Sequence, residues 1–403
     1  MGHDHGAGSD LPDDPQTTAI ARRALTFAVL PLVLAAAVAM VVLWPRGATP
    51  ELATGLEFPA ELVDGTVARV DDDVLCPGVD DPLGPTCTIA TVDVTSGSQA
   101  GRSVPLEVTA GPATPVLRPG DKIVMGHVID LPLGAPVSAE FYFADYQRDF
   151  PLLLLGLIFA VAVVALGRWR GLRALGALGA SLAVLVLFVL PAILQGSSPV
   201  AVAIVGSAVI MTVALFLSHG INVRTASALL GTLVSLGLTG ILAMVFVGAT
   251  RLTGLASEEA VYLQVSAERI NLQGLILAGI IIGSLGVLDD VTVTQASAVW
   301  ELRKANRSWG FSQLYRPAVR IGRDHIASTV NTLVLAYAGA SLPLLVLFTQ
   351  AERPLVEVAG GEVVATEIVR TLVGSIGLVA SVPITTALTA LALVGGSALR
   401  KGE

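Results

Sequence analysis

The chain is dominated by long apolar runs that short polar segments separate. About 20 helical residues cross the hydrocarbon core of a bilayer, and windows of that length predict eight membrane spans. The predicted spans are residues 24–44, 150–167, 174–194, 200–217, 225–248, 272–288, 326–348 and 368–394. The pattern therefore predicts an α-helical polytopic membrane protein, in which an anchor is followed by an insert and then by a seven-helix core over residues 149–403.

Residues 45–148 interrupt this pattern and predict a β-domain between the first and second spans. Four segments alternate with the two-residue period of half-buried strands, and Gly, Pro and Asp turn signals separate them. These segments are LVDGTVARV, CTIATVDV, RSVPLEV and DKIVMGHVI. We expect a small β-barrel or β-sandwich, and the turn RPGDKIV at residues 118–124 favours a barrel of the OB or SH3-like kind.

Composition agrees with a protein that lies in a lipid bilayer. Hydrophobic residues make up 53% of the 403 residues, and charged residues only 14%, which is more apolar than an ordinary soluble domain. The net charge is -8, and no basic stripe is interleaved with aromatic residues. We therefore expect lipid as a partner and exclude nucleic acid.

The positions of Lys and Arg predict the topology, because basic residues collect in cytoplasmic loops. If residues 1–23 are a cytoplasmic tail, the inner segments contain Arg22, Arg23, Arg168, Arg170, Arg173, Arg224, Arg303, Lys304, Arg307, Arg316, Arg320, Arg323, Arg400 and Lys401. The outer loops contain only Arg251, Arg269, Arg353 and Arg370. We expect both termini inside and the β-domain outside.

The two cysteines, Cys76 and Cys87, both lie in the insert. A cysteine pair on the outer, oxidising side of a membrane is most simply a disulfide, which would close the loop CPGVDDPLGPTC. Two thiolates without a nearby histidine do not complete a zinc shell. The sequence therefore predicts a disulfide between Cys76 and Cys87. It predicts no cofactor, and it does not say whether the chain binds a metal.

An acidic pair, Asp289 and Asp290, follows the sixth predicted span directly. Charged side chains at this depth are costly and usually functional. In a continuing helix Asp290 shares a stripe with Thr294, and Asp289 lines up with Thr292. The carboxylates and hydroxyls could bind a cation or share a proton. The alternative is that they flank the span at the interface and pair with Arg303.

Polar residues in the last two spans are candidates to converge with this pair. Arg323 and Asp324 lie at the mouth of the seventh span, Asn331 lies inside it, and Glu367 and Arg370 are spaced for an ion pair at the start of the eighth. The alternative for each residue is packing between helices. The chain contains no HExxH, P-loop, GxSxG or Rossmann motif, so we do not expect an enzyme.

The proline-rich cysteine loop, the His-containing tail and the Ala/Val-rich spans look like an actinobacterial version of the YibE/F-like family of bacterial multi-pass membrane proteins, and several segments of the chain resemble that family. They are DYQRDFPLLLLGLIF with RWRGLRAL, GVLDDVTVTQASAVWELR, IGRDHIASTVNTLVLAYAGASLPLLVLF, and EIVRTLVGSIGLVASVPITT. The resemblance implies a multi-pass protein of the bacterial cytoplasmic (plasma) membrane and places the candidate site residues within family-like motifs. It implies no reaction and at most a link to transport.

Two functions remain open from the sequence. The first is an ion or small-solute transporter, in which the acidic pair coordinates a cation or proton and the last two spans complete a cavity. The second is a noncatalytic envelope scaffold, in which the outer β-domain binds an envelope protein or the chain pairs with a second copy of itself. The chain has no ATP-binding motif, so transport would use an ion gradient or a separate subunit.

Overall fold

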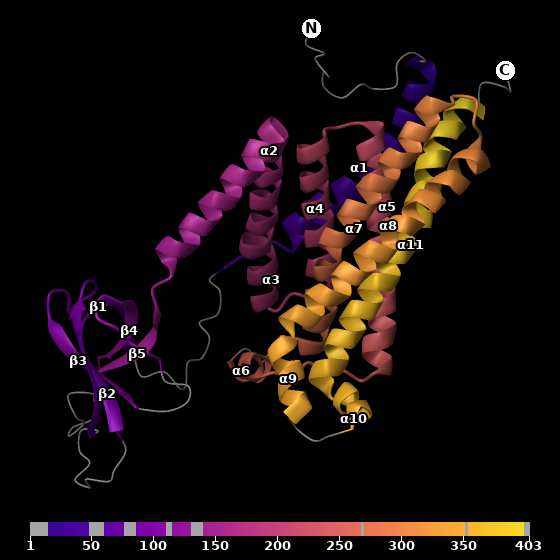
Figure 1. Cartoon of the computed structure of the whole chain (residues 1–403). Helices are drawn as coiled ribbons and strands as arrows, with labels where there is room; N and C mark the ends of the chain where they lie inside the picture. The colour runs from indigo at the N-terminus through magenta and orange to yellow at the C-terminus, as the bar shows by residue number, and fades with distance from the viewer. Residues whose placement is uncertain are drawn as a thin grey trace. The chain divides into compact units, whose positions relative to one another are not determined.

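The computed structural model describes residues 15–47, 60–75, 86–109, 115–129, 140–266, 270–350 and 354–398. The chain divides into two compact units. One unit comprises residues 53–163, and the other comprises residues 1–52 together with 164–403. The first contains the strands and the second contains most of the helices (Figure 1).

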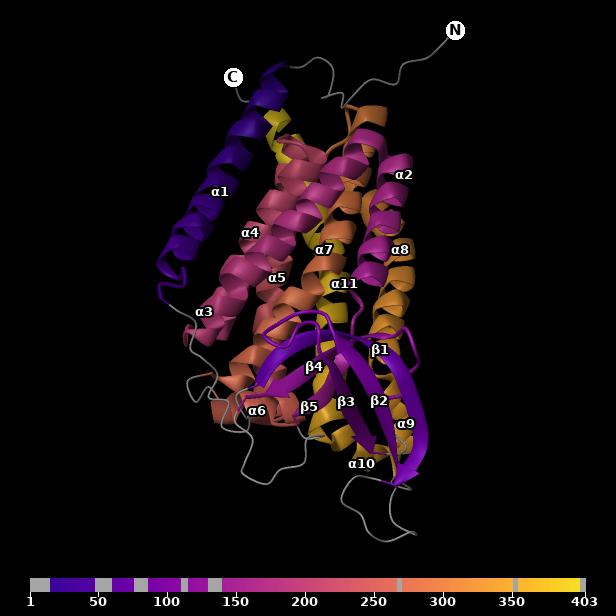
Figure 2. The same ribbon diagram turned by 90° about the vertical axis from the view of Figure 1, so that its left-hand side faces the viewer.

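The strands form one antiparallel sheet of five strands in the order β3-β2-β1-β4-β5. They are β1 (Ala60–Leu75), β2 (Thr86–Val94), β3 (Ser103–Thr109), β4 (Lys122–Val128) and β5 (Phe141–Tyr146). The first half of the long strand β1 pairs with β4 and its second half with β2. The edge strands β3 and β5 approach each other, so the sheet curls (Figure 2). The prediction of a small β-domain is confirmed as a single curled sheet, which is closer to a barrel than to a sandwich.

Alternate strand residues fill the inside of the curl. Val63, Val92, Leu106, Ile123 and Met125 are each at most 1% exposed, as expected for the buried face of a pleated sheet. Cys87 is also buried, on β2. Cys76 lies outside the described residues, so the disulfide stays a prediction.

The helices have the following bounds: α1 (Pro15–Val42), α2 (Asp149–Val184), η2 (Leu185–Val189), α3 (Leu190–Leu194), α4 (Pro199–His219), α5 (Val223–Ala249), α6 (Glu258–Ser266), α7 (Leu272–Ala305), α8 (Phe311–Ala340), α9 (Leu342–Gln350), α10 (Leu355–Gly360) and α11 (Glu362–Ala398). Side chains of Ser198, Asn222 and Asn271 cap the first turns of α4, α5 and α7, because they accept hydrogen bonds from backbone N–H groups that lack helical partners. The first turn of α1 and the last turn of α11 lie at the same end of the helical unit (Figure 1).

Six helical segments among the described residues are long and apolar enough to cross a membrane, or seven if α8 and α9, bent by 67°, form one span. One of the six, Asp149–Leu194, has 46 residues, which as one straight α-helix would measure about 69 Å, more than twice a hydrocarbon core of about 30 Å. Its backbone breaks at Arg168 (φ 50°, ψ -129°), between two predicted spans. If this segment forms two spans divided at Arg168, and α8 and α9 together form one span, the chain has the predicted eight spans. The number eight stays a prediction.

Helix α7 lies at the centre of the helical unit and packs against α4, α5, α8 and α11. It continues to Ala305, beyond the predicted span end at residue 288. The acidic pair therefore lies near the middle of a long helix. This position brings Asp289 and Asp290 to the level at which other helices present polar side chains.

Candidate functional site

A group of buried polar side chains joins α5, α7 and α11, and we call it the polar seam. Its members are Thr232, Ser235, Thr239, Thr292, Gln295, Ser381, Thr385, Thr386 and Thr389, each at most 2% exposed. The surrounding clusters of the unit consist of apolar residues. Polar groups inside a membrane protein usually bond across helices, so the first question is which of these groups are paired.

Part of the polar seam is hydrogen-bonded between helices. The hydroxyls of Thr232 on α5 and Thr292 on α7 lie 2.6 Å apart. The Gln295 side chain donates to Thr386 Oγ1 on α11 at 2.7 Å and to the Ala318 carbonyl on α8 at 2.8 Å. These bonds tie four helices together at one level of the unit.

Other hydroxyls of the seam have no partner among the described residues. They are Ser235 Oγ, Thr385 Oγ1 and Thr389 Oγ1, and Ser375 Oγ on α11 joins them. Buried polar atoms in proteins are nearly always hydrogen-bonded to protein or water. Three of these hydroxyls, those of Ser375, Thr385 and Thr389, lie along α11 and are free to bond water or a polar ligand.

A pocket of about 360 Å³ opens beside α7 and α8. It is lined by Val291, Thr294, Gln295, Ile321, Gly322, Asp324, His325 and Val382. Gln295 lines this pocket and also donates to Thr386. The pocket and the polar seam therefore meet at the Gln295 side chain.

The two acidic residues of α7 point to different faces of the helix, because neighbours in an α-helix are about 100° apart. Asp289 Oδ1 is buried and has no hydrogen-bond partner among the described residues. The Asp290 side chain is 70% exposed, and its Oδ2 lies 3.9 Å from His325 Nε2. The hydroxyl of Thr292 contacts the Asp289 carbonyl at 3.1 Å. Asp289 and Asp290 therefore have separate surroundings and no common partner in this structure.

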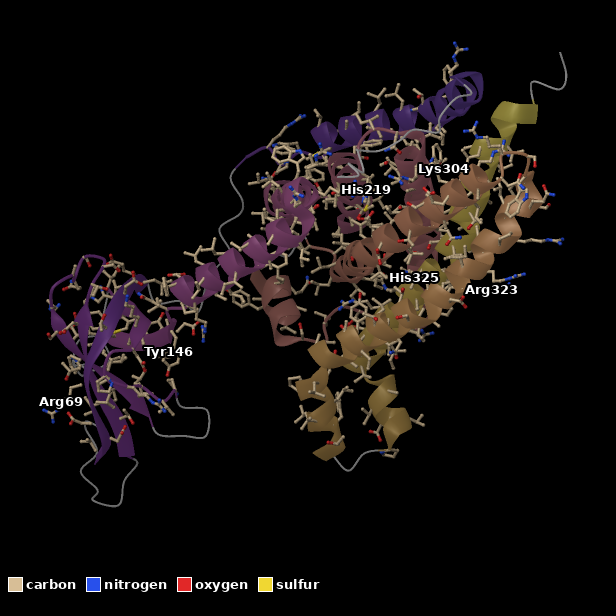
Figure 3. The ribbon with its side chains drawn as sticks, turned by 45° about the horizontal axis from the view of Figure 1, so that its top comes forward. Arg69, Tyr146, His219, Lys304, Arg323 and His325 are labelled. Atoms are coloured by element: carbon tan, nitrogen blue, oxygen red, sulfur yellow. The ribbon has the colours of Figure 1, made fainter. Side chains whose placement is uncertain are left out.

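The predicted residues of α8 are divided between the pocket and the exposed helix surface. Asp324 lines the pocket together with His325 and Thr294. Arg323 and Asn331 are exposed, and Figure 3 labels Arg323 and His325 on this helix. Of the predicted α8 residues, Asp324 is the one that lies at the pocket.

Glu367 and Arg370 form a separate group on α11. Arg370 Nη1 donates to Glu367 Oε1 at 2.7 Å, and both side chains are 27% exposed. Glu367 and Tyr337 line a second pocket of about 260 Å³ between α8, α9 and α11. His325 and Tyr337 are about 18 Å apart along α8 at the helical rise, so the predicted residues fall into two groups.

Sequence reasoning missed Gln295, Thr232 and Ser235, which occupy the centre of the seam. Glutamine is rare in an apolar helix. Gln295 lies one turn after the buried Val291 on α7, and this spacing was the available signal that its side chain is buried. The serine and threonine residues gave no signal, because hydroxyls are common in membrane helices. Their alignment depends on the packing of helices that are distant in the sequence.

Comparison with known proteins identifies the family of the chain. No curated protein and no solved structure gives a significant match to the chain. A family model, described as YibE/F-like protein, matches residues 155–395. This match spans more than half of the chain and includes both pockets and the polar seam, so the chain belongs to the YibE/F-like family.

Proposed function

We propose that the chain is a non-enzymatic transporter of an ion or small solute in the bacterial cytoplasmic membrane, with both termini inside and the β-domain outside. The supporting observation is the line of polar groups on α11. Arg370, Ser375, Ser381, Thr385 and Thr389 lie within one half of the helix circumference and are buried or half-buried. From Arg370 to Thr389 they extend about 28 Å, close to the hydrocarbon thickness of about 30 Å.

Each group has a role in this proposal. The pocket beside His325 is the entrance at one end, because it holds Asp324 and Thr294 and meets the polar seam at Gln295. The ion pair of Glu367 and Arg370 marks the other end. Intramembrane charges are costly and typically mark ion or substrate pathways, and Asp289 is the carboxylate with a buried, unpartnered oxygen.

The test is flux through purified protein in liposomes, over a panel of H⁺, Na⁺, K⁺, Mg²⁺ and Zn²⁺. The variants are Asp289→Asn, Asp290→Asn and the double substitution. Glu301→Gln is the matched control, because Glu301 is an exposed carboxylate on the same helix outside the seam. Loss of flux in the Asp289 variant with full flux in the control supports the proposal, and undiminished flux in the double variant contradicts the role of the acidic pair.

The alternative is a scaffold in which the outer domain binds an envelope protein or a second copy of the chain. The observation that favours it is the separate hydrophobic core of the β-unit, with residues such as Leu106 and Ile123 fully buried. In complementation of a deletion strain, this alternative predicts that removal of the β-domain abolishes function while Asp289→Asn is harmless. The opposite pattern supports transport.

A further inference from the structure

The polar seam is tightly packed at two points, where glycines meet side chains of a neighbouring helix. A Cβ atom added to Gly231 on α5 would overlap the Thr385 side chain, and one added to Gly377 on α11 would overlap the Thr239 side chain. At these two points the space cannot hold one methyl group, so it cannot hold a hydrated metal ion. A proton needs no such space there, because the hydroxyl that fills it, that of Thr385 or Thr239, is itself both a donor and an acceptor.

The groups in the seam are of the kind that can pass a proton along. A hydroxyl is both a donor and an acceptor, and either oxygen of the Thr232–Thr292 bond could be the donor. The hydroxyls of Ser235, Thr385 and Thr389 in the same seam are also buried and have no hydrogen-bond partner among the described residues. Water bound to such hydroxyls would complete a chain, since buried waters typically bond otherwise unpaired polar groups.

The same residues fit a dehydrated metal ion poorly. Mg²⁺ and Ca²⁺ need six or more oxygen ligands, which in proteins include at least one or two carboxylates. Asp289 and Asp290 lie on different faces of α7, and the described residues contain no group of three or more His, Cys, Asp or Glu side chains able to hold a metal. Among the described residues, the acidic pair thus lacks the carboxylate-rich surroundings of a Mg²⁺ or Ca²⁺ site.

The pocket end contains groups that exchange protons with water. His325 Nε2 lies 3.9 Å from Asp290 Oδ2, and Asp324 lines the same pocket. An imidazole ring has one nitrogen that donates and one that accepts, and a carboxylate beside it offers a second acceptor. Gln295 connects this pocket to Thr386.

We propose that the transported ion is the proton, which moves along the polar seam between the pocket at His325 and the Glu367–Arg370 pair. This inference rests on the proposed transport function and names its substrate. Each proton accepted at one end is matched by a proton released at the other, so the side chains are unchanged after a cycle. The tight contacts of Gly231 and Gly377 exclude larger ions.

The experiment measures proton and metal-ion flux side by side in liposomes that contain the full chain. A K⁺ gradient with valinomycin sets the membrane potential, and a trapped pH-sensitive dye reports protons. Thr385→Val and Ser235→Ala test the seam. Thr212→Val is the control, because Thr212 lies on α4 and donates to the Ala208 carbonyl of its own helix. Gel filtration of each variant checks folding.

We expect proton flux in the wild type and in the Thr212 control, a loss of at least tenfold in the folded seam variants, and no flux of the metal ions. Metal-ion flux that requires Asp289 without proton movement overturns this inference and leaves the transport function standing. If the seam variants conduct protons as fast as the wild type, the proposed route along the polar seam is wrong. Absence of flux for every ion removes both proposals.

Discussion

The hydroxyl oxygens of Thr232 on α5 and Thr292 on α7 lie 2.6 Å apart, and both side chains are fully buried. This bond joins two helices that are distant in the sequence at the level of the acidic pair. Each hydroxyl also contacts a carbonyl of its own helix, that of Ala228 or Asp289. The pair therefore fixes α5 against α7 next to the residues with candidate function.

We expect Thr232→Val and Thr292→Val to be coupled in a double-mutant cycle. Hydrogen bonds between membrane helices contribute about 0.6 kcal/mol on average and at most about 1.7 kcal/mol, so a coupling of that size should appear in the free energy of unfolding. The measurement is reversible unfolding in mixed detergent micelles. Fully additive effects of the two substitutions would show that the bond contributes nothing.

The sequence alone predicted four of the five described strands and the long apolar helices, whereas β5 and the short helices α6 and α10 were not predicted. The alternation through residues such as Val63 and Val67 placed strands and their buried face, because a strand has a period of two. The long apolar runs likewise placed the helices. Strand order was not predictable, because it depends on pairing between segments such as β1 and β4 that are far apart in the chain.

The candidate site could be predicted only in part. Helical periodicity already separates Asp289 from Asp290 by about 100°, but the sequence does not say which helices each one faces. The distance between Asp290 and Glu367 was not predictable either. It depends on where α7 and α8 end, and both helices continue beyond the apolar runs that predicted them. Contacts such as Gly377 against Thr239 involve two small residues whose alignment appears only in the folded chain.

We expect Gly377→Ala to destabilise the helical unit. Its new methyl group would overlap the Thr239 side chain, and overpacking of a tight core typically costs about 1 to 3 kcal/mol. Thr239→Ala removes the obstacle, so the double variant should regain part of the loss. The measurement is the free energy of unfolding in detergent.

Gly286→Ala is the control for this prediction. No atom lies within 4 Å of a Cβ at Gly286 on α7, and alanine is favoured over glycine inside a helix by roughly 0.5 to 1 kcal/mol. We expect this variant to be as stable as the wild type or more stable. Equal losses at Gly286 and Gly377 would contradict the packing argument.

We expect Glu61 to make the stability of the turn at Ser98 in the β-unit depend on pH. Its carboxylate accepts hydrogen bonds from the Ser98 hydroxyl and from the Ser98 N–H at 2.9 Å, and His127 Nδ1 lies 3.7 Å away. These bonds, those of Ser98 first, lower the pKa of Glu61 below its ordinary value of 4.5. A lowered folded pKa means that the stabilisation is present above pH 4.5 and is lost as the pH falls through the folded value.

The measurement compares amide hydrogen exchange of the Ser98 turn in the wild type and in Glu61→Gln at the same pH. We expect stronger protection in the wild type near pH 7. The difference should disappear in acid, because protonated Glu61 resembles the glutamine that replaces it. A difference that persists at low pH would show that the carboxylate charge is not its cause.

The ion pair of Glu367 and Arg370 allows the last prediction. For a buried pair, removal of one partner costs about 3 to 5 kcal/mol, because the other charge is left unpaired. Both side chains here are 27% exposed, so we expect Glu367→Gln to cost less than this in thermal unfolding of the detergent-solubilised chain. The inverted pair Glu367→Arg/Arg370→Glu restores opposite charges at the same spacing and should recover most of the loss. If the inverted pair is no more stable than Glu367→Gln, the side chains stabilise α11 through contacts other than their charges.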